Sequence, residues 1–480
     1  MNIFKKKSLC VALAGAGVLS LAGAAQAVNL NPDGLGQVLI YPYYTTRADG
    51  AGNNYNSLLS VVNTTASVKA VKVRFLEGKN SQEVLDFNLY LSPKDVWTTA
   101  IVPMGSGAGI ATSDQSCTLP AIPAGGKAFV NFQLAADGAG SSLDRTTEGY
   151  VEIIEMASYA DTSTTAKNVT HVGGVPPGCA KQTDALGLAE GVRPSGGLMG
   201  GMTLINVSSG ADYTEDAVAL DNFYNPLPAP FPQTLYTGAG VPTPDLTQSF
   251  PPQSIVVANN AVYQSGWGAG PDPVSAVLMH DQIMNEYVLD AATNSGTDWV
   301  VTMPTKRFYV SNGTGTPPVL FQRNFNKTDG ACDDVSLNIY DREENTTSTP
   351  LDFSPPPPTQ TNSLCWEANV ITFNNSNVLG SANSANIPTT FEHGWLDLGF
   401  FPTSVTPPVH TLFNASTTIT PLGGVGVPGS ATYVGLPVVG FAVQSFANGA
   451  ITVGDKSVLS NYGGNFIHKG TRLIVPGALD

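Results

Sequence analysis

Three glutamates lie close together in one short segment and are the residues best placed for acid–base chemistry. Glu148, Glu152 and Glu155 occur within residues 148–156, EGYVEIIEM. Glycoside hydrolysis requires paired carboxylates, one as acid and the other as base or nucleophile. On a strand, however, Glu152 and Glu155 point to opposite faces. We therefore expect solvated or edge-protecting charges, and no catalytic residue is assigned.

Other catalytic motifs are missing from the sequence. The histidines are scattered, and neither H-E-x-x-H nor H-x-H occurs, so a metalloprotease site has no support. No G-x-S-x-G elbow is present to expose a nucleophilic serine. Glycine-rich stretches at 105–109 and 196–201 lack the Lys-Ser/Thr pair of a P-loop. The sequence therefore assigns no catalytic residue and no metal ligand.

Calcium is the one cofactor that the sequence leaves open. Asp333 with Asp334, and the segment 212–216, could supply oxygen ligands from surface loops. Neither segment matches an EF-hand loop. We therefore predict no cofactor, with structural calcium as the weaker hypothesis.

The N-terminus has the three parts of a cleavable secretion signal, residues 1–27. Lysines at 5–7 are followed by an apolar stretch, 8–23, and Ala25 and Ala27 form an A-x-A cleavage site. A retained membrane anchor needs about 20 apolar residues. We therefore expect export to the periplasm, the cell surface or the extracellular space, and no integral membrane span in the mature chain.

Cysteine usage agrees with an exported chain. Cys10 leaves with the signal, and Cys117, Cys179, Cys332 and Cys365 remain. An even number of cysteines in an exported protein favours disulfides, and no C-x₂₋₄-C spacing suggests zinc. Three pairings are open. We favour the sequential one, because it keeps each bridge within one half of the chain.

The negative net charge limits the classes of molecule that the protein can bind. The formal net charge is −15, and removing the signal, which carries three lysines and no acidic residue, makes it −18. Nucleic acids and anionic membrane surfaces both require a basic face. The candidate partners are therefore cell-surface polysaccharide and other envelope proteins, with no nucleic acid.

Short apolar runs separated by turn residues predict a mainly β fold. We expect two immunoglobulin-like β-sandwich regions, at 28–195 and 297–480, around a mixed connecting region at 196–296. In the segment 70–75, Val and Phe alternate with Lys72 and Arg74, so one face should be buried and the other wet. The strands expected first are 37–41, 56–63, 70–75, 83–91, 95–102, 127–134 and 148–156, and those expected later include 298–303, 306–310, 336–340, 367–373, 394–398 and 440–446.

Two helices are expected in the connecting region. The first lies near 214–223, with Thr214 as N-cap and acidic residues in the first turn. The second, near 275–292, has an apolar stripe at helical spacing. For the aromatic cluster at 41–44, YPYY, we favour packing into a core over an exposed binding platform.

Several segments resemble a family of secreted, β-rich bacterial cell-surface proteins known only as hypothetical proteins. The resemblance implies export and a β-rich fold, and it implies no reaction and no functional residue. It rests on VLIYPYYT (38–45), LLSVVNTT (58–65), AVKVRFLEGKNSQEVLDFNLYLSPKDVW (70–97), GGLMGGMTLINVSSG (196–210), TDWVVTMPTKR (297–307) and GLPVVGFAVQSF (435–446).

These observations favour an exported structural or binding protein of the cell surface or extracellular matrix. The alternative is a secreted protein that binds or hydrolyses polysaccharide through surface carboxylates. A carboxylate pair about 5–10 Å apart in a cleft would favour the alternative.

Overall fold

A computed structural model describes residues 27–268, 270–310, 319–346, 362–401 and 409–477. The chain is mainly β, as the sequence predicts, and its sheets are almost entirely antiparallel. Within the described residues there are three short α-helices: α1 (Thr164–Val169), α2 (Asp184–Glu190) and α3 (Asp272–Leu278).

Two sheets form a sandwich from the N-terminal half. The central sheet has seven strands in the order β1 (Asn29–Leu30), β13 (Val218–Asp221), β2 (Val38–Thr45), β10 (Glu148–Tyr159), β4 (Val68–Glu77), β5 (Glu83–Leu91) and β8 (Thr118–Leu119). The outer sheet has six: β12 (Ala211–Asp216), β11 (Leu198–Asn206), β3 (Asn56–Asn63), β6 (Val96–Met104), β7 (Gly107–Ala111) and β9 (Lys127–Ala128).

The C-terminal half contributes three larger sheets. The first is β14 (Gln253–Ala258), β15 (Ala261–Gly266), β25 (Thr411–Pro421), β26 (Val427–Val434) and β33 (Leu473–Gly477). The second is β20 (Ser336–Asp341), β24 (His393–Gly399), β17 (Gln282–Val288) and β32 (Lys469–Thr471). The third is β23 (Ser384–Ile387), β22 (Ala368–Phe373), β18 (Ser295–Thr302), β28 (Val439–Phe446) and β31 (Tyr462–Ile467).

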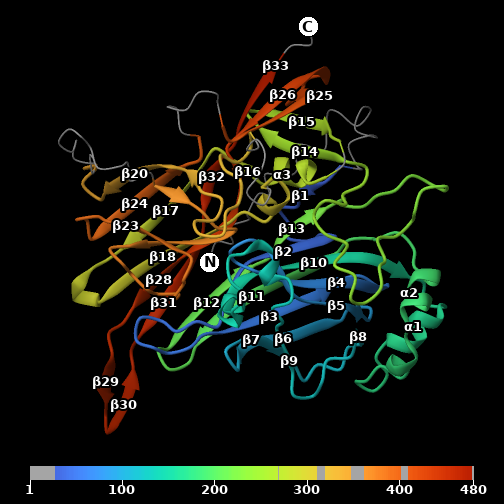
Figure 1. Cartoon of the computed structure of the whole chain (residues 1–480), viewed down its shortest axis with the longest axis horizontal. Helices are drawn as coiled ribbons and strands as arrows, with labels where there is room; N and C mark the ends of the chain where they lie inside the picture. Colours follow the sequence, from blue (N-terminus) through green and yellow to red (C-terminus); the bar gives the residue numbers. More distant parts are fainter. Residues whose placement is uncertain (1–26, 269, 311–318, 347–361, 402–408, 478–480) are drawn as a thin grey trace, which may run out of the picture.

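Three two-stranded pairs complete the described strands. They are β16 (Met279–His280) with β27 (Leu436–Pro437), β19 (Asp333–Asp334) with β21 (Ser363–Leu364), and β29 (Ala450–Val453) with β30 (Lys456–Leu459). The hairpin β29–β30 projects from the body of the molecule (Figure 1), and all of its strand residues are exposed.

The central sheet is buried on both faces. Leu39, Val73 and Ile153 pack against the outer sheet, whereas Val38 and Ile154 belong to the core shared with the C-terminal sheets. Figure 1 shows β2, β10 and β4 lying between the outer sheet and the C-terminal sheets. Every residue of these three strands is buried. The prediction of one wet face for 70–75 is therefore wrong: Lys72 and Arg74 are buried.

The rings of the YPYY segment are in the core. Tyr41, Tyr43 and Tyr44 are almost fully buried. Pro42 cannot donate a ladder hydrogen bond, and the register between β2 and β10 shifts beside it. Such a bulge accommodates a proline inside a paired strand. The Pro42 carbonyl instead accepts a hydrogen bond from Thr302 Oγ1 of β18 (2.7 Å), which fastens the central sheet to the C-terminal half.

Both predicted helices of the connecting region are wrong. Residues 214–223 form the end of β12 and then β13, and the side chains of β12 alternate between buried and exposed. Of 275–292, only the start is helical, in α3, and β16 and β17 follow. The buried residues Ile283 and Tyr287 fit a strand period as well as a helix period, so the pattern was ambiguous.

The strands predicted at 127–134 and 306–310 are also short or missing. The first contains only β9, and the second contains a 3₁₀ turn, Lys306–Phe308.

The region 196–296 contributes strands to both halves. Its strands β11, β12 and β13 pair within the N-terminal sheets, whereas β15 and β17 pair with C-terminal strands and β14 pairs with β15 at the edge of the same sheet.

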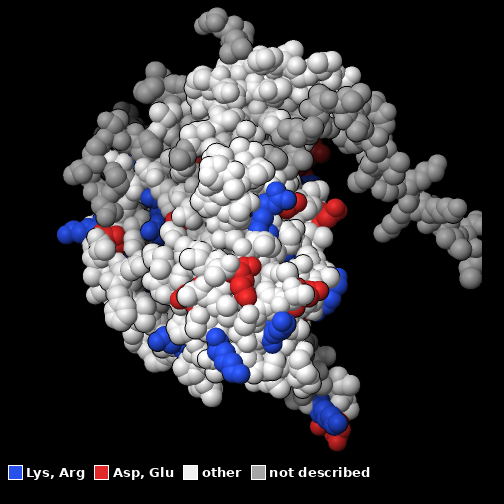
Figure 2. Space-filling view, turned by 90° about the vertical axis from the view of Figure 1, so that its right-hand side faces the viewer, with Lys and Arg blue, Asp and Glu red and all other residues white. Residues whose placement is uncertain are grey.

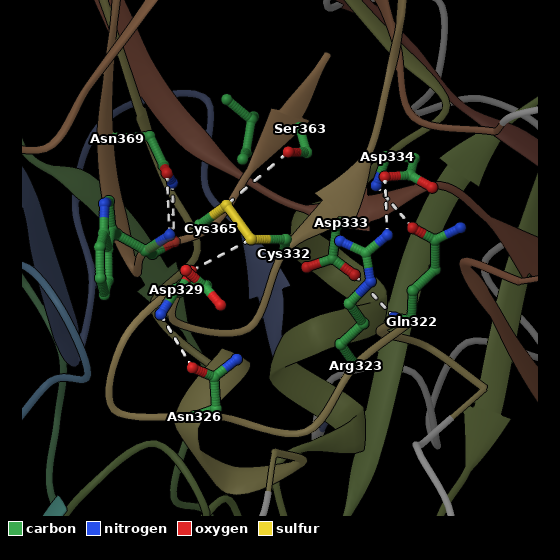
Figure 3. Close-up of a disulfide and its surroundings, with 12 residues drawn as sticks. Gln322, Arg323, Asn326, Asp329, Cys332, Asp333, Asp334, Ser363, Cys365 and Asn369 are labelled. Carbon is green, nitrogen blue, oxygen red and sulfur yellow. Dashed lines mark hydrogen bonds and ion pairs between the residues drawn. A yellow bond between two sulfur atoms is a disulfide. The ribbon is translucent and has the colours of Figure 1, made fainter. Parts of the chain in front are cut away.

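Two disulfides connect the cysteines in the sequential pairing. Cys117 is bonded to Cys179, which links the strand β8 region to the segment between α1 and α2. Cys332 is bonded to Cys365, beside the pair β19–β21 (Figure 3). Each bridge closes a loop within one half of the chain and so restricts the unfolded state.

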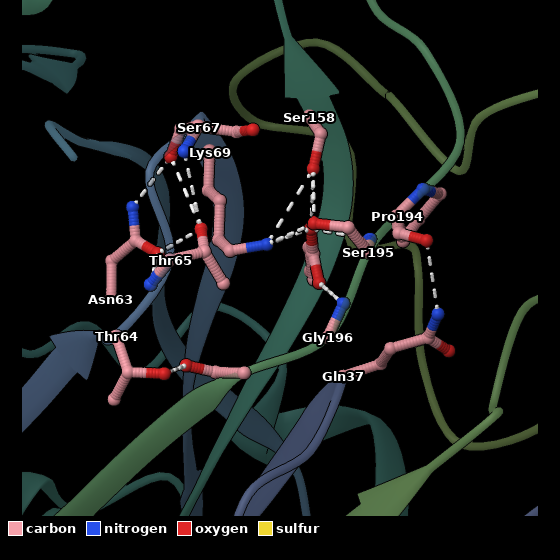
Figure 4. Close-up of polar contacts among 12 residues, drawn as sticks. Gln37, Asn63, Thr64, Thr65, Ser67, Lys69, Ser158, Pro194, Ser195 and Gly196 are labelled. Carbon is pink, nitrogen blue, oxygen red and sulfur yellow. Dashed lines mark hydrogen bonds and ion pairs between the residues drawn. The ribbon is translucent and has the colours of Figure 1, made fainter. Parts of the chain in front are cut away.

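A buried ion pair fixes Lys69 of β4 against Glu155 of β10. Both side chains are fully buried, and Lys69 Nζ lies 2.7 Å from Glu155 Oε1. The same carboxylate accepts hydrogen bonds from the backbone N–H groups of Ser195 (3.0 Å) and Gly196 (2.8 Å). Figure 4 shows Lys69 directed toward Ser158 and Ser195 in this network. The carboxylate therefore joins two strands and the segment leading into β11.

We expect Lys69→Met to lower the free energy of unfolding by about 3–5 kcal/mol, because it leaves the Glu155 carboxylate buried without its cation. Adding Glu155→Gln should recover part of this loss, since the amide oxygen still accepts from the backbone of Ser195 and Gly196. Urea denaturation of the mature protein measures the free energy of unfolding of both variants. The exposed Lys127→Met is the control, with an expected change within about 0.5 kcal/mol. A Lys69→Met variant as stable as this control would contradict the assignment.

Candidate functional site

The three glutamates proposed as possible acid–base groups are ion-paired inside the central sheet. Glu152 lies directly opposite Arg74 in the β10–β4 register and forms an ion pair with it. Burial raises the pKa of Glu152 to about 7, although the Arg74 charge opposes this shift. The expectation of solvated or edge-protecting charges is wrong, because β10 is an interior strand with a neighbour on each side.

Glu148 fastens the two halves together. Its carboxylate accepts hydrogen bonds from Tyr43 Oη (2.8 Å) and Arg47 Nε (2.9 Å) on the N-terminal side. It also accepts from Ser381 Oγ (2.6 Å) and the Ala382 N–H (2.9 Å) on the C-terminal side. With four donors around it, this carboxylate is engaged in holding the interface.

The residues considered for calcium are placed differently from the surface loops expected. Asp333 is fully buried, with Lys306 Nζ at 2.8 Å and His410 Nε2 at 3.2 Å. Burial raises the pKa of Asp333, but the positive charge of Lys306 and the hydrogen bond from His410 together outweigh this effect and hold that pKa below its usual value. Asp334 pairs with Arg323 (3.3 Å; Figure 3). The 212–216 segment runs along β12, where its acidic side chains alternate between faces.

A polar cleft lies between the two halves of the chain. Its volume is about 890 Å³. Half of its lining consists of six asparagines and five serines. We call it the amide cleft; it is lined by Asp49, Gly50, Ala51, Asn53, Tyr55, Ser208, Ser209, Ala211, Leu289, Ala291, Asn294, Ser295, Gly296, Phe373, Asn374, Asn375, Ser376, Asn377, Val378, Ser445, Ala447 and Asn461.

Direct hydrogen bonds across the cleft hold its two walls together. Tyr55 Oη donates to the Val378 carbonyl (2.9 Å), and the Gly50 N–H donates to the Asn377 carbonyl (3.0 Å). At the other side, Asn461 Nδ2 donates to the carbonyl of Ser209 (2.8 Å). These contacts join segments far apart in the sequence, so the cleft is formed before any ligand arrives.

Four asparagine side chains in the cleft have unused hydrogen-bonding groups. The side-chain amides of Asn53, Asn294, Asn375 and Asn377 make no hydrogen bond to any residue in the described parts of the chain. By contrast, Asn374 binds the backbone of Thr389 through both its amide nitrogen and its oxygen. Each free amide offers two donors and one acceptor.

Local backbone geometry explains why asparagine occurs here. Asn294 (φ 44°), Asn374 (φ 50°) and Asn375 (φ 59°) are all in the left-handed region, which asparagine tolerates better than most residues. In the opposite wall, Asp49 Oδ1 accepts hydrogen bonds from the N–H groups of Ala51 and Asn53, both at 2.9 Å. The lining is therefore built from turns.

A buried aspartate supports the C-terminal wall. Asp298 of β18 accepts hydrogen bonds from Ser376 Oγ (2.7 Å) and the Leu379 N–H (2.9 Å). Burial raises the pKa of Asp298 to about 6, and these hydrogen bonds partly offset the shift. Asp298 therefore fixes the turn that carries Asn375 and Asn377.

A second concavity lies on the exposed face of the outer sheet. This outer groove has a volume of about 670 Å³. Small and hydroxyl side chains, such as Ser60, Thr98 and Ala100, make up much of its lining, with Asp33 and Asp216 among the other residues. It is shaped by a single sheet face, whereas the amide cleft uses both halves of the chain.

Sequence reasoning did not identify the amide cleft. Its residues come from six separate segments of the chain, and no motif spacing connects them. The only local signal is a density of asparagine and serine at 373–377, FNNSN, which a search for catalytic motifs passes over.

Comparison of the chain with family models, with curated proteins and with solved structures gives no match. Within the described ranges, no helix is long and apolar enough to cross a membrane. The geometry of the chain itself therefore carries the functional argument.

Glu367, which precedes β22, should make stability depend on pH. It is fully buried, its Oε2 atom has no hydrogen-bond partner in the described residues, and burial raises its pKa to about 8. In the unfolded chain the pKa is about 4.3. Between these values the folded state binds the extra proton, so the contribution of Glu367 to stability is greatest below about pH 4 and is lost as pH rises toward 8.

We expect the urea midpoint of the mature protein to be lower at pH 8.5 than at pH 6, and Glu367→Gln to reduce this difference. Glu152 and Asp298 have raised pKa values in the same direction, so part of the pH dependence should remain. The exposed Glu286→Gln serves as the control. An unchanged pH dependence in Glu367→Gln would exclude the buried proton as its source.

Proposed function

We propose that this chain is an exported binding protein of the cell surface or extracellular matrix, and that it holds cell-surface polysaccharide in the amide cleft. One observation carries the proposal: in the described parts of the chain, four asparagine amides without a hydrogen-bond partner and five serines line a cleft of about 890 Å³. Asn53 is half-buried, and Asn294, Asn375 and Asn377 are exposed, so these amides are open to an incoming ligand. A ligand rich in hydroxyl groups would pair them.

The chemistry of the lining fits a neutral sugar chain. Each sugar hydroxyl both donates and accepts, as each asparagine amide does. Tyr55 and Phe373 lie behind the lining and are almost fully buried, so contact with a sugar chain would rest on the polar groups. Asp49 is the only acidic residue among the described lining residues. The cleft therefore presents polar groups with little charge, which suits an uncharged polymer.

Binding is favoured over hydrolysis. The two-carboxylate mechanism needs an acid and a second carboxylate about 5–10 Å apart. In the cleft, Asp49 already accepts two backbone hydrogen bonds through Oδ1 and one from Asn206 Nδ2 (3.0 Å) through Oδ2. Glu148, Glu152 and Glu155 are engaged in buried ion pairs. These three glutamates therefore do not supply the surface carboxylates that a polysaccharide hydrolase would need.

Export is supported by the N-terminal sequence pattern and by the two disulfides, which persist in oxidising compartments. Of the two predicted cleavage residues, Ala25 lies outside the described residues and Ala27 is buried. The N–H of Val28, the first residue after the cleavage site, donates to the Gln253 carbonyl (2.9 Å). An N-terminal amine at Val28 can make the same contact.

Figure 2 shows a face with few charged side chains on a largely uncharged surface, as suits contact with a neutral polymer.

We expect the protein recovered from the cell envelope or medium to begin Val28-Asn29-Leu30, because signal peptidase cleaves after the A-x-A site. N-terminal sequencing measures this directly. Ala27→Asp should leave the signal attached and retain the protein in the membrane fraction, whereas Gln26→Ser, between the two small residues, should be processed normally. A cytoplasmic protein beginning at Met1 would contradict export.

Asn294→Gly with Asn375→Gly should weaken binding to the insoluble polysaccharide of the producing cells by at least about tenfold, since two amide hydrogen bonds are lost. Glycine is chosen because both positions have positive φ. Co-sedimentation of the purified mature protein with this polysaccharide is the measurement.

The matched control makes the same change at Asn259 and Asn260, which also have positive φ but lie in the β14–β15 turn. Thr98→Ala with Thr214→Ala tests the outer groove. Undiminished binding by the cleft variant, or loss only in the groove variant, would refute the cleft as the binding site. Steady release of reducing sugar by the wild-type protein would refute the non-catalytic assignment.

A further inference from the structure

We propose that Asp290, Glu392 and His393 bind a divalent transition-metal ion, with Zn²⁺ as the ion that fits best. One oxygen from each carboxylate and one imidazole nitrogen all lie within 4.8 Å of one another. None of these residues lines the amide cleft, so the proposal stands independently of the proposed function.

Strand pairing brings the three residues together. In the antiparallel register of β17 and β24, Val288 faces His393. One step beyond, the Leu289 N–H donates to the Glu392 carbonyl (2.7 Å). The ladder therefore brings the backbone at residue 290 close to residues 392 and 393, although about a hundred positions separate them in the chain. Glu392 lies just before β24, and its carboxylate is on the same side as the Asp290 and His393 ligand atoms. Sites held by strand ends are positioned more precisely than sites on free loops.

The two carboxylate oxygens of Asp290 make different contacts. Oδ1 accepts a hydrogen bond from the Ala292 N–H (2.8 Å) and caps the 3₁₀ turn Ala291–Thr293. Oδ2 points instead toward His393, 3.9 Å from its Nε2 atom. Carboxylates that bind metals are commonly held in this way, with a hydrogen bond to one oxygen fixing the direction of the other.

The mixture of donor atoms selects the ion. Calcium and magnesium prefer ligand sets made of oxygen, whereas an imidazole with carboxylates suits zinc and similar ions. Ligands about 2.1 Å from a tetrahedral zinc are about 3.4 Å apart. The 3.9 Å between Asp290 and His393 therefore needs to close only slightly. Three protein ligands leave one position for water or an incoming ligand.

The surroundings allow an ion to enter and be held. Glu392 is exposed, and Asp290 and His393 are half-buried, so the ligand atoms can be reached from solvent. Arg342 is near enough to Glu392 for their charges to interact. Its Nε atom, however, pairs with Glu343 (2.8 Å). Arg342 is thus a weak competitor for Glu392, and its removal is a useful probe.

The test is calorimetric titration of Zn²⁺ into the mature protein after treatment with a chelator. We expect one saturable site, weakened at least about tenfold by His393→Ala and by Asp290→Asn. The asparagine keeps the oxygen that caps the 3₁₀ turn, so its variant should fold. Arg342→Ala should tighten binding. Excess Ca²⁺ should not displace the zinc.

His171→Ala is the matched control, because His171 lies 3.6 Å from Asp95 in a histidine–aspartate pair without a third ligand. It should leave zinc binding unchanged. The proposal is overturned if the wild-type protein shows no saturable site, if Asp290→Asn and His393→Ala bind as the wild type does, or if His171→Ala abolishes binding. Displacement by Ca²⁺ would overturn the choice of ion.

Discussion

Burial of the central sheet on both faces is the constraint on which the rest of this structure depends. A sheet packed on one side only can send its charged side chains to water. In β2, β4 and β10 no such side exists, so each cation needs an anion beside it. Lys69 has Glu155, and Arg74 lies between Glu83 and Glu152. The ion pairs are a consequence of the layered architecture.

These pairs contribute more to register than to net stability. Removing two charges from water costs about as much as their attraction returns, so a buried pair adds little compared with packed apolar residues. A shift of one residue between β10 and β4, however, would turn Glu152 away from Arg74 and place both charges among apolar side chains. We therefore interpret the paired charges as the feature that excludes wrong registers, while apolar packing supplies the stability.

The sequence predicted local features well and their surroundings poorly. The mainly β class and most strands followed from period-two alternation and turn residues, and the YPYY rings were rightly placed in a core. The alternation of Lys72 and Arg74 with Val71 and Val73 was real, but whether the polar face meets water depends on distant segments. The carbonyls of Gly238 and Val241, 166 and 169 positions away, accept hydrogen bonds from Lys72. The same reason accounts for Glu148, whose partners Ser381 and Ala382 lie in the other half.

The helix errors and the missed cleft have different physical causes. Over a few residues, apolar positions can satisfy a helix and a strand period together, and tertiary pairing then decides; for β12 the partner β11 decided for a strand. The amide cleft has no local pattern, since its asparagines are turn residues that any loop could contain. Only the joining of the two halves through Tyr55 and Gly50 brings them to one place.

That joining also determines how the cleft can work. Its walls are linked by hydrogen bonds, and Asp298 fixes the turn behind Asn375 and Asn377 from within the core. A ligand therefore meets amides whose backbones are already positioned, and little ordering cost remains to be met on binding. The hydrogen bonds that join the two halves across the cleft therefore also set the distance between its walls.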